Sequence, residues 1–150
     1  MKHLPWRAPA WHARPALRLR FLAELTGTGI TVRPIRPPRR YRGGFAVRCT
    51  VTPPGVEPRE VTIVFAVGSP EVPRVFVDGP TESPHRYLSD GLCMWFPFDG
   101  PDQRWLRGDG AAALLGHIII HLIKEEWWRR TGEWVGAEAP HDAREDQESP

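Results

Sequence analysis

The chain has 150 residues, of which 41% are hydrophobic and 25% charged, and its net charge is +2. These values fit one globular domain that buries a core without disulfides or structural metals. Nearly all the positive charge is arginine, but acidic residues almost balance it, so we expect no nucleic-acid binding.

Targeting and redox signals in the sequence point to the cytoplasm. Two cysteines, Cys49 and Cys93, are too few for a disulfide framework. The first residues lack the apolar segment of a secretory signal. The longest apolar run, residues 114–123, is too short to span a bilayer. We therefore expect a cytoplasmic protein with free thiols and no membrane contact.

The N-terminal region predicts an arm followed by a helix. Residues 1–14 are rich in Pro, Trp and Arg, and we expect them to be ordered only if Trp6 or Trp11 docks on the domain. Pro15 suits the first turn of a helix that runs to about Leu25 and that Gly27 can end. The apolar side of this helix is formed by Leu17, Phe21, Leu22 and Leu25.

Four short strands are predicted next, over residues 30–35, 45–51, 61–67 and 74–77. The second and third alternate between two faces, as half-buried strands do. One face of this pair carries Phe45, Val47, Cys49, Val51, Val61, Ile63, Phe65 and Val67. Short turn-like links between the strands favour an antiparallel meander in an α+β fold.

A long loop and a second helix complete the predicted domain. Residues 80–110 mix Pro, Gly, Asp, Ser and aromatics without a period, and loops of this length tend to be functional. A largely buried helix is expected over residues 110–130. Its apolar surface carries Leu114, Leu115, Ile118, Ile119, Leu122 and Ile123, and its remaining stripe carries His117, His121, Lys124 and Trp128. Residues 142–150 are expected to form a polar tail.

Cys93 is the strongest candidate for covalent chemistry. It lies in the long loop, where a substrate has access, with His85 and Asp90 shortly before it. A thiol attacks as its thiolate, and a nearby histidine can orient or activate it. The alternative is a half-buried structural cysteine. Cys49, on the apolar face of a strand, is expected to act as a small hydrophobic residue.

Two further groups of residues allow a second interpretation. His117 and His121 have the i, i+4 spacing of two metal ligands, with a third available from His141, His85 or Cys93. No metalloprotease signature accompanies them, so a polar seam is the preferred interpretation and no metal is predicted. Similarly, Trp127, Trp128 and Trp134 could stack a ligand but more often would close the end of a core.

Three blocks of the sequence together resemble the prokaryotic E2-like family of bacterial antiphage operons of the CBASS type. The segment HRYLSDGLCMWFP, residues 85–97, resembles the active-site segment of ubiquitin-conjugating (UBC-fold) enzymes. Trp105 resembles the tryptophan that follows the nucleophile. The segment EEWWRRTGEWVGAEAPH, residues 125–141, resembles the tail of bacterial members. The resemblance implies a UBC-like domain over residues 15–141.

The resemblance also implies roles for individual residues. Cys93 matches the thioester-forming cysteine, and His85 matches the histidine of the His–Pro–Asn segment. Arg86 and Tyr87 stand where eukaryotic members have Pro and Asn, so the usual oxyanion group is missing. Arg86, Asp90 or a backbone N–H is expected to replace it.

The implied activity is acyl transfer. An E1-like activating enzyme would deliver the C-terminus of a ubiquitin-like or other protein to Cys93 as a thioester, and an amine would then attack it. The implied partners are this E1-like enzyme and a ubiquitin-like protein or a cGAS-like nucleotidyltransferase, which some relatives modify directly. No cofactor is implied. Two alternatives stay open at this point: an E2-like module that only binds proteins, and a metal-dependent hydrolase built on the histidines.

Overall fold

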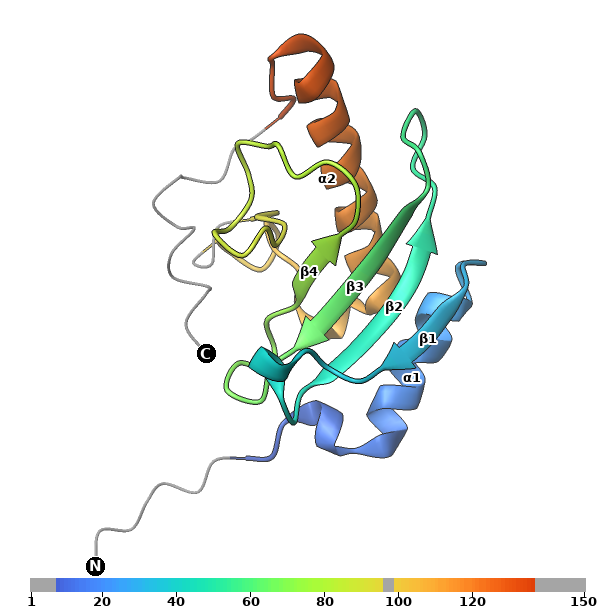
Figure 1. Ribbon diagram of the computed structural model, residues 1–150. Coiled ribbons are helices and arrows are strands. Elements are labelled where there is room, and N and C mark those ends of the chain that lie inside the picture. The colour runs from blue at the N-terminus through green and yellow to red at the C-terminus, as the bar shows by residue number, and fades with distance from the viewer. Residues whose placement is uncertain (1–7, 96–98, 137–150) are drawn as a thin grey trace, which may run out of the picture.

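The computed structural model describes residues 8–95 and 99–136. Its elements are η1 (Trp11–Ala13), α1 (Pro15–Thr26), β1 (Val32–Ile35), η2 (Arg39–Tyr41), β2 (Phe45–Val51), β3 (Arg59–Phe65), β4 (Arg74–Val77), η3 (Arg107–Asp109) and α2 (Ala111–Thr131). The four strands form one antiparallel sheet in the order β1-β2-β3-β4, and both helices lie on the same side of it (Figure 1). The predicted α+β class and meander are confirmed.

The sheet register follows from the two-residue alternation of its central strands. Cys49 of β2 pairs with Val61 of β3 and with Val32 of β1. The core beneath the helices receives Phe45, Val47, Cys49, Val51, Val61, Ile63 and Phe65. The opposite face holds a smaller cluster in which Tyr41 of η2 packs with Ala46, Val64 and Ala66. A one-residue slip would exchange the two faces, so burial specifies the register.

The helices complete the core from two sides. Phe21 and Leu25 of α1 and Leu114, Leu115, Ile118 and Leu122 of α2 are buried in it. The Glu24 carboxylate accepts a hydrogen bond from the N–H of Ala111 at 2.7 Å, which satisfies a free donor at the start of α2. Glycine at position 110 suits this junction, because its φ is +88°.

The described residues before α1, 8–14, pack on the rest of the structure through Trp11. Trp11 is buried against Phe21, Phe45 and Phe65, and its indole N–H donates to the carbonyl of Pro70 at 2.6 Å. Of the two tryptophans expected as alternatives to dock the arm, Trp11 does pack on the domain. Trp6 and the polar tail at 142–150 lie outside the described residues.

Two local predictions were wrong. Val67 is 55% exposed, because β3 ends at Phe65 and the chain then leaves the sheet. Ile123 is exposed, because only one side of α2 faces the core. The prediction that Gly27 ends α1 is confirmed, because Gly27 is the C-cap of this helix; its conformation is right-handed, and the left-handed residue is Gly29.

The two edges of the sheet differ. The β4 edge continues into the loop, because the N–H of Leu92 donates to the carbonyl of Val75 at 2.9 Å. The β1 edge carries Pro34, which has no backbone N–H to donate. None of the described helices is both long enough and apolar enough to cross a membrane.

The buried position of Cys49 gives a first testable expectation. Burial raises the pKa of its thiol to about 11, so at neutral pH it is an uncharged group in the core. Cys49→Ala removes packed volume and is expected to lower the free energy of unfolding by about 1 kcal/mol or more while leaving activity intact. Denaturant unfolding would measure the loss. An unchanged stability would contradict the assignment of Cys49 to the core.

Candidate active site

The segment around Cys93 folds as a small hairpin beside β4. Arg86 and Leu92 form an antiparallel bridge, and the N–H of Cys93 donates to the carbonyl of His85 at 3.1 Å. The turn is closed by the N–H of Tyr87 donating to the carbonyl of Gly91 at 2.8 Å. Asp90 lies in this turn with φ of +68°, a conformation that aspartate tolerates better than most residues. The irregular loop expected here is therefore locally ordered.

Cys93 and His85 line a cavity of about 70 Å³ between this hairpin and α2. Such a volume holds a few water-sized groups. Its walls are formed by His85, Cys93, Met94, His117, Ile120, His121, Lys124 and Trp134. The predicted polar stripe of α2 supplies three of these residues, His117, His121 and Lys124. The structure thus brings Cys93 together with histidines from two separate elements.

Both thiols of the chain are only 2% exposed. The sequence predicted an accessible loop thiol at position 93, and this was wrong because the hairpin turns Cys93 inward, toward α2. The surroundings of the two thiols nevertheless differ. Cys49 is enclosed by apolar core side chains, whereas Cys93 borders a polar cavity.

Trp134 covers part of the cavity. Its ring lies 4.3 Å from the ring of His85 and 5.4 Å from that of His121, measured between centroids. Gly132 takes a left-handed conformation at the end of α2, so the chain turns back and places Trp134 over the helix. Trp127, in contrast, is 48% exposed. Of the predicted tryptophan group, Trp134 is the one that reaches the cavity.

A buried ion pair fastens the hairpin to α2. The Arg86 guanidinium donates to both carboxylate oxygens of Glu125, with Nε–Oε2 at 2.6 Å and Nη2–Oε1 at 2.7 Å. Glu125 is fully buried and Arg86 is 6% exposed. Nη1 of Arg86 also donates to the carbonyl of Asp90 at 2.9 Å. One side chain therefore binds the turn of the hairpin and the helix together.

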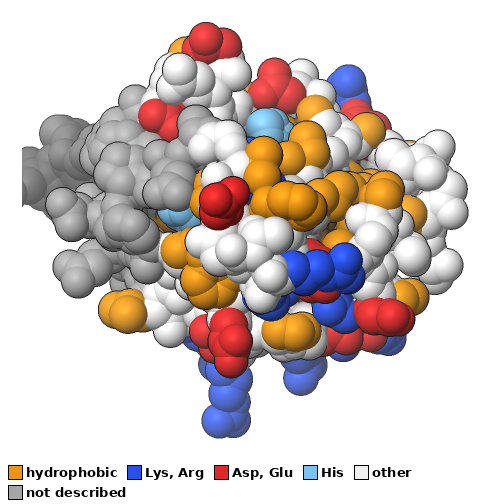
Figure 2. All heavy atoms as spheres, turned by 90° about the horizontal axis from the view of Figure 1, so that it is seen from above, with side chains coloured by type: hydrophobic (Ala, Val, Ile, Leu, Met, Phe, Trp, Pro, Cys, Tyr) orange, Lys and Arg blue, Asp and Glu red, His pale blue; other side chains and the backbone are white. Residues whose placement is uncertain are grey.

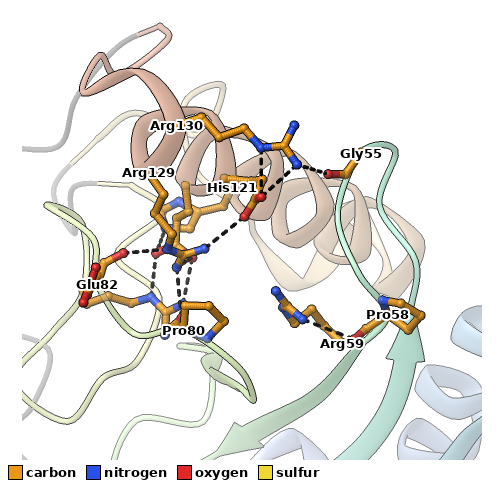
Figure 3. A network of polar contacts seen from close by, with 11 residues as sticks. Gly55, Pro58, Arg59, Pro80, Glu82, His121, Arg129 and Arg130 are labelled. Carbon is orange, nitrogen blue, oxygen red and sulfur yellow. Dashed lines mark hydrogen bonds and ion pairs between the residues drawn. The ribbon is translucent and has the colours of Figure 1, made fainter.

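The same carboxylate contacts the cavity wall and a second arginine. Nε2 of His121 lies 3.6 Å from Oε2 of Glu125, and Nη2 of Arg129 lies 3.6 Å from Oε1. Arg129 further donates to the carbonyls of Pro80 and Glu82, both at 2.9 Å (Figure 3). The network holds the start of the loop, the hairpin and α2 in one arrangement.

The charge states in this network follow from the contacts. Burial alone raises the pKa of Glu125, but the hydrogen bonds from the Arg86 guanidinium, together with the nearby imidazole of His121, outweigh it and lower the pKa to about 2. Glu125 is therefore ionised at neutral pH. Burial lowers the pKa of His117, with the charge of Asp109 opposing, so this cavity imidazole is neutral at pH 7.

Arg86 and Asp90, the candidates to replace the missing asparagine, do not line the cavity. Arg86 is occupied by Glu125, and Asp90 is exposed at the turn. The role of Glu125 was not predicted. No pattern in the sequence indicates that this carboxylate is buried and pairs with Arg86, which lies 39 positions away. Trp134 had a signal, its place shortly after a helix-ending glycine.

The structure describes four of the five candidate metal ligands. His85, Cys93, His117 and His121 border the same cavity, whereas His141 lies outside the described residues. Within residues 8–95 and 99–136, no group of three or more His, Cys, Asp or Glu side chains is arranged to hold a metal ion.

The family model described as "Type II CBASS E2 protein" matches residues 33–142. The chain belongs to this family. The match includes the hairpin, the cavity and α2, and it confirms the resemblance seen in the sequence. Comparisons with curated proteins and with solved structures gave no match.

Membership in the type II CBASS E2 family assigns an E2-like role in antiphage defence. It also implies operon partners such as E1-like enzymes and ubiquitin-like proteins. The fold of this CBASS E2 protein is compatible with the UBC-like fold, since a helix precedes a four-stranded antiparallel meander and a further helix follows the loop that carries Cys93.

Proposed function

We propose that this CBASS E2 protein is an acyltransferase that carries the C-terminus of a partner protein as a thioester on Cys93 and transfers it to an amine. The observation that carries the proposal is the shared cavity of Cys93, His85 and the histidines of α2. A thiolate is a good leaving group, so a thioester keeps the acyl group reactive toward amines. A partner would supply the activated donor.

The hairpin gives Cys93 a fixed position for this chemistry. His85 lies directly across the hairpin from Cys93 and borders the same cavity, which suits a group that orients the thiol. The Arg86–Glu125 pair acts indirectly: it does not line the cavity but holds the hairpin against α2. We assign Arg86 a positioning role rather than contact with the oxyanion.

Exposed apolar side chains in the hairpin turn and at the cavity wall suit docking of a partner protein. Leu88 in the hairpin turn is 81% exposed, and Ile120 at the cavity wall is 54% exposed. Viewed from above, hydrophobic side chains gather in the middle of the described surface, with charged side chains beside them (Figure 2). An apolar centre with a polar rim is the common composition of protein interfaces.

The proposal is tested by co-expressing the chain with its operon partners and running the products on gels with and without reductant. Wild-type protein is expected to show an adduct that disappears with reductant, and Cys93→Ala is expected to show none. Cys49→Ala is the matched control and should keep the adduct. Absence of any adduct while the partners are active would contradict the enzyme function.

A second candidate function, an E2-like module that only binds proteins, is favoured by one observation. Cys93 is 2% exposed, so a donor tail reaches it only after the cavity opens. If the protein only binds its partners, Cys93→Ala should retain both partner binding and antiphage protection. Loss of protection with retained binding would instead support the acyltransferase.

His85→Ala is expected to slow transfer by on the order of tenfold or more per folded molecule, because the group beside Cys93 is lost. Some loss of stability accompanies it, since His85 is 1% exposed. Rates are therefore normalised to folded protein, with Ser89→Ala in the same hairpin as a control. A normal rate in folded His85→Ala protein would make His85 purely structural.

A further inference from the structure

The walls of the cavity are held in place in different ways. The hairpin is fixed to α2 by the ion pair of Arg86 with Glu125, and α2 is fixed by its packing in the core. The remaining wall, Trp134, comes from residues 132–136, which form neither helix nor strand. No backbone hydrogen bond joins Trp134 or the two residues after it to the other described residues. This wall is therefore the least constrained part of the cavity.

Trp134 is kept over the cavity by contacts between rings. Its centroid lies 4.3 Å from that of His85 and 5.4 Å from that of His121, with the ring planes inclined by 57° and 60°. Its indole N–H is buried, and within residues 8–95 and 99–136 it has no hydrogen-bond acceptor. A buried donor without an acceptor is unfavourable, and an N–H that turns outward gains a bond to water. The ring contacts thus favour the closed position, and the desolvated N–H opposes it.

Two glycines lie on either side of this tryptophan in the chain. Gly132 has a φ of +78° and Gly136 a φ of +89°. Glycine adopts such conformations without the clash that a Cβ causes, and it exchanges easily between left- and right-handed values. Hinges are a few residues at the end of an element that absorb a large change of φ and ψ. Gly132, the C-cap of α2, lies where such a hinge is expected.

We propose that residues 132–136 form a lid that closes over Cys93 in the free protein, and that Trp134 leaves the cavity when the C-terminus of the donor enters. The lid explains why the Cys93 thiol borders a polar cavity and is nevertheless only 2% exposed. Displacement of Trp134 opens the cavity without breaking the buried ion pair between Arg86 and Glu125. The part played by the donor rests on the proposed thioester function, whereas the lid itself does not.

Alkylation of the two thiols in the full chain tests the lid without any partner. Iodoacetamide is added to the folded protein, and mass spectrometry of digested samples follows Cys93 and Cys49 separately. Trp134→Ala is expected to raise the Cys93 rate on the order of tenfold or more, because the closed position is lost. The Cys49 rate should stay unchanged. Since Cys49 is also 2% exposed, its rate reports any general loosening of the fold.

Two further variants separate the lid from other effects. Trp134→Phe keeps an aromatic ring beside the histidines and should raise the Cys93 rate less than Trp134→Ala does. Trp127→Ala is the matched control, because Trp127 belongs to α2, is 48% exposed and does not line the cavity. It should leave both thiol rates unchanged. Melting temperatures show whether each variant is folded.

The part played by the donor is tested with the operon partners present. Timed gels without reductant measure how fast the adduct forms on Cys93. Trp134→Ala should form it faster than wild-type protein, because loading no longer waits for the lid to open. Trp127→Ala should form it at the wild-type rate.

The results that overturn the inference are distinct from those that overturn the proposed function. A wild-type Cys93 alkylation rate in Trp134→Ala, or a parallel rise at Cys49, would refute the lid. Faster alkylation with adduct formation no faster than in wild-type protein would refute the gating of the donor. Failure of the thioester function gives no adduct in wild-type protein while the partners are active, and the alkylation rates then still decide the lid.

Discussion

Cys93→Ser is expected to convert the donor adduct from a thioester into an oxyester. The serine variant, if the partner enzyme loads it, should give an adduct that resists reductant and yields to mild base. Discharge to amines should slow on the order of a hundredfold, which corresponds to about 3 kcal/mol in activation free energy, because an alkoxide is a poorer leaving group than a thiolate. Timed gels with added amine would measure the rates.

The wild-type protein is the control for this experiment. The wild-type adduct should disappear with reductant and the serine adduct should not. Identical behaviour of the two adducts toward reductant would place the acyl group on a residue other than residue 93.

The largest stability effect is expected at Glu125. Glu125→Ala removes the partner of a buried guanidinium, and breaking such a pair costs about 3–5 kcal/mol because the remaining charge is buried without compensation. Glu126→Ala on the next position is the matched control, since Glu126 makes ion pairs at the surface with Arg129 and Arg130 and should cost less than about 1 kcal/mol. Denaturant unfolding of both variants would compare the two.

The same residue predicts how stability depends on pH. The pKa of Glu125 is about 2 in the folded protein, against 4.5 as its ordinary value. A lowered pKa stabilises the fold above the ordinary value, and this contribution is lost as the pH falls from about 4.5 toward 2. The expected loss is about 3 kcal/mol. It should be absent in Glu125→Gln, and an equal acid loss in both proteins would contradict it.

The sheet and the core were predictable because their signals repeat along the sequence. In residues 45–51 every second side chain is a large apolar one or Cys49, with Ala46, Arg48 and Thr50 between them, so their faces followed from periodicity. The polar stripe of α2 was predictable for the same reason, and it does border the cavity through His117, His121 and Lys124.

The arrangement of the site was less predictable, because it depends on single long-range contacts. Residues 80–110 show no repeating pattern that would predict the hairpin in which His85 and Cys93 lie opposite each other. This hairpin is held by one bridge and a few backbone hydrogen bonds. The pairing of Arg86 with Glu125 depends on how that hairpin lies against α2. The burial of Cys93 follows from both contacts and could not be read from its neighbours in the chain.

The proline in β1 affects whether the edge of the sheet can pair with a strand of another molecule. An edge strand offers unpaired backbone groups on which another chain can add a strand, and this is a common route to aggregation. Pro34 interrupts that row of donors, and Arg33 beside it adds a charge. Pro34 and Arg33 therefore lower the tendency of copies of this protein to associate through β1, which suits a protein expected to bind several partners in turn.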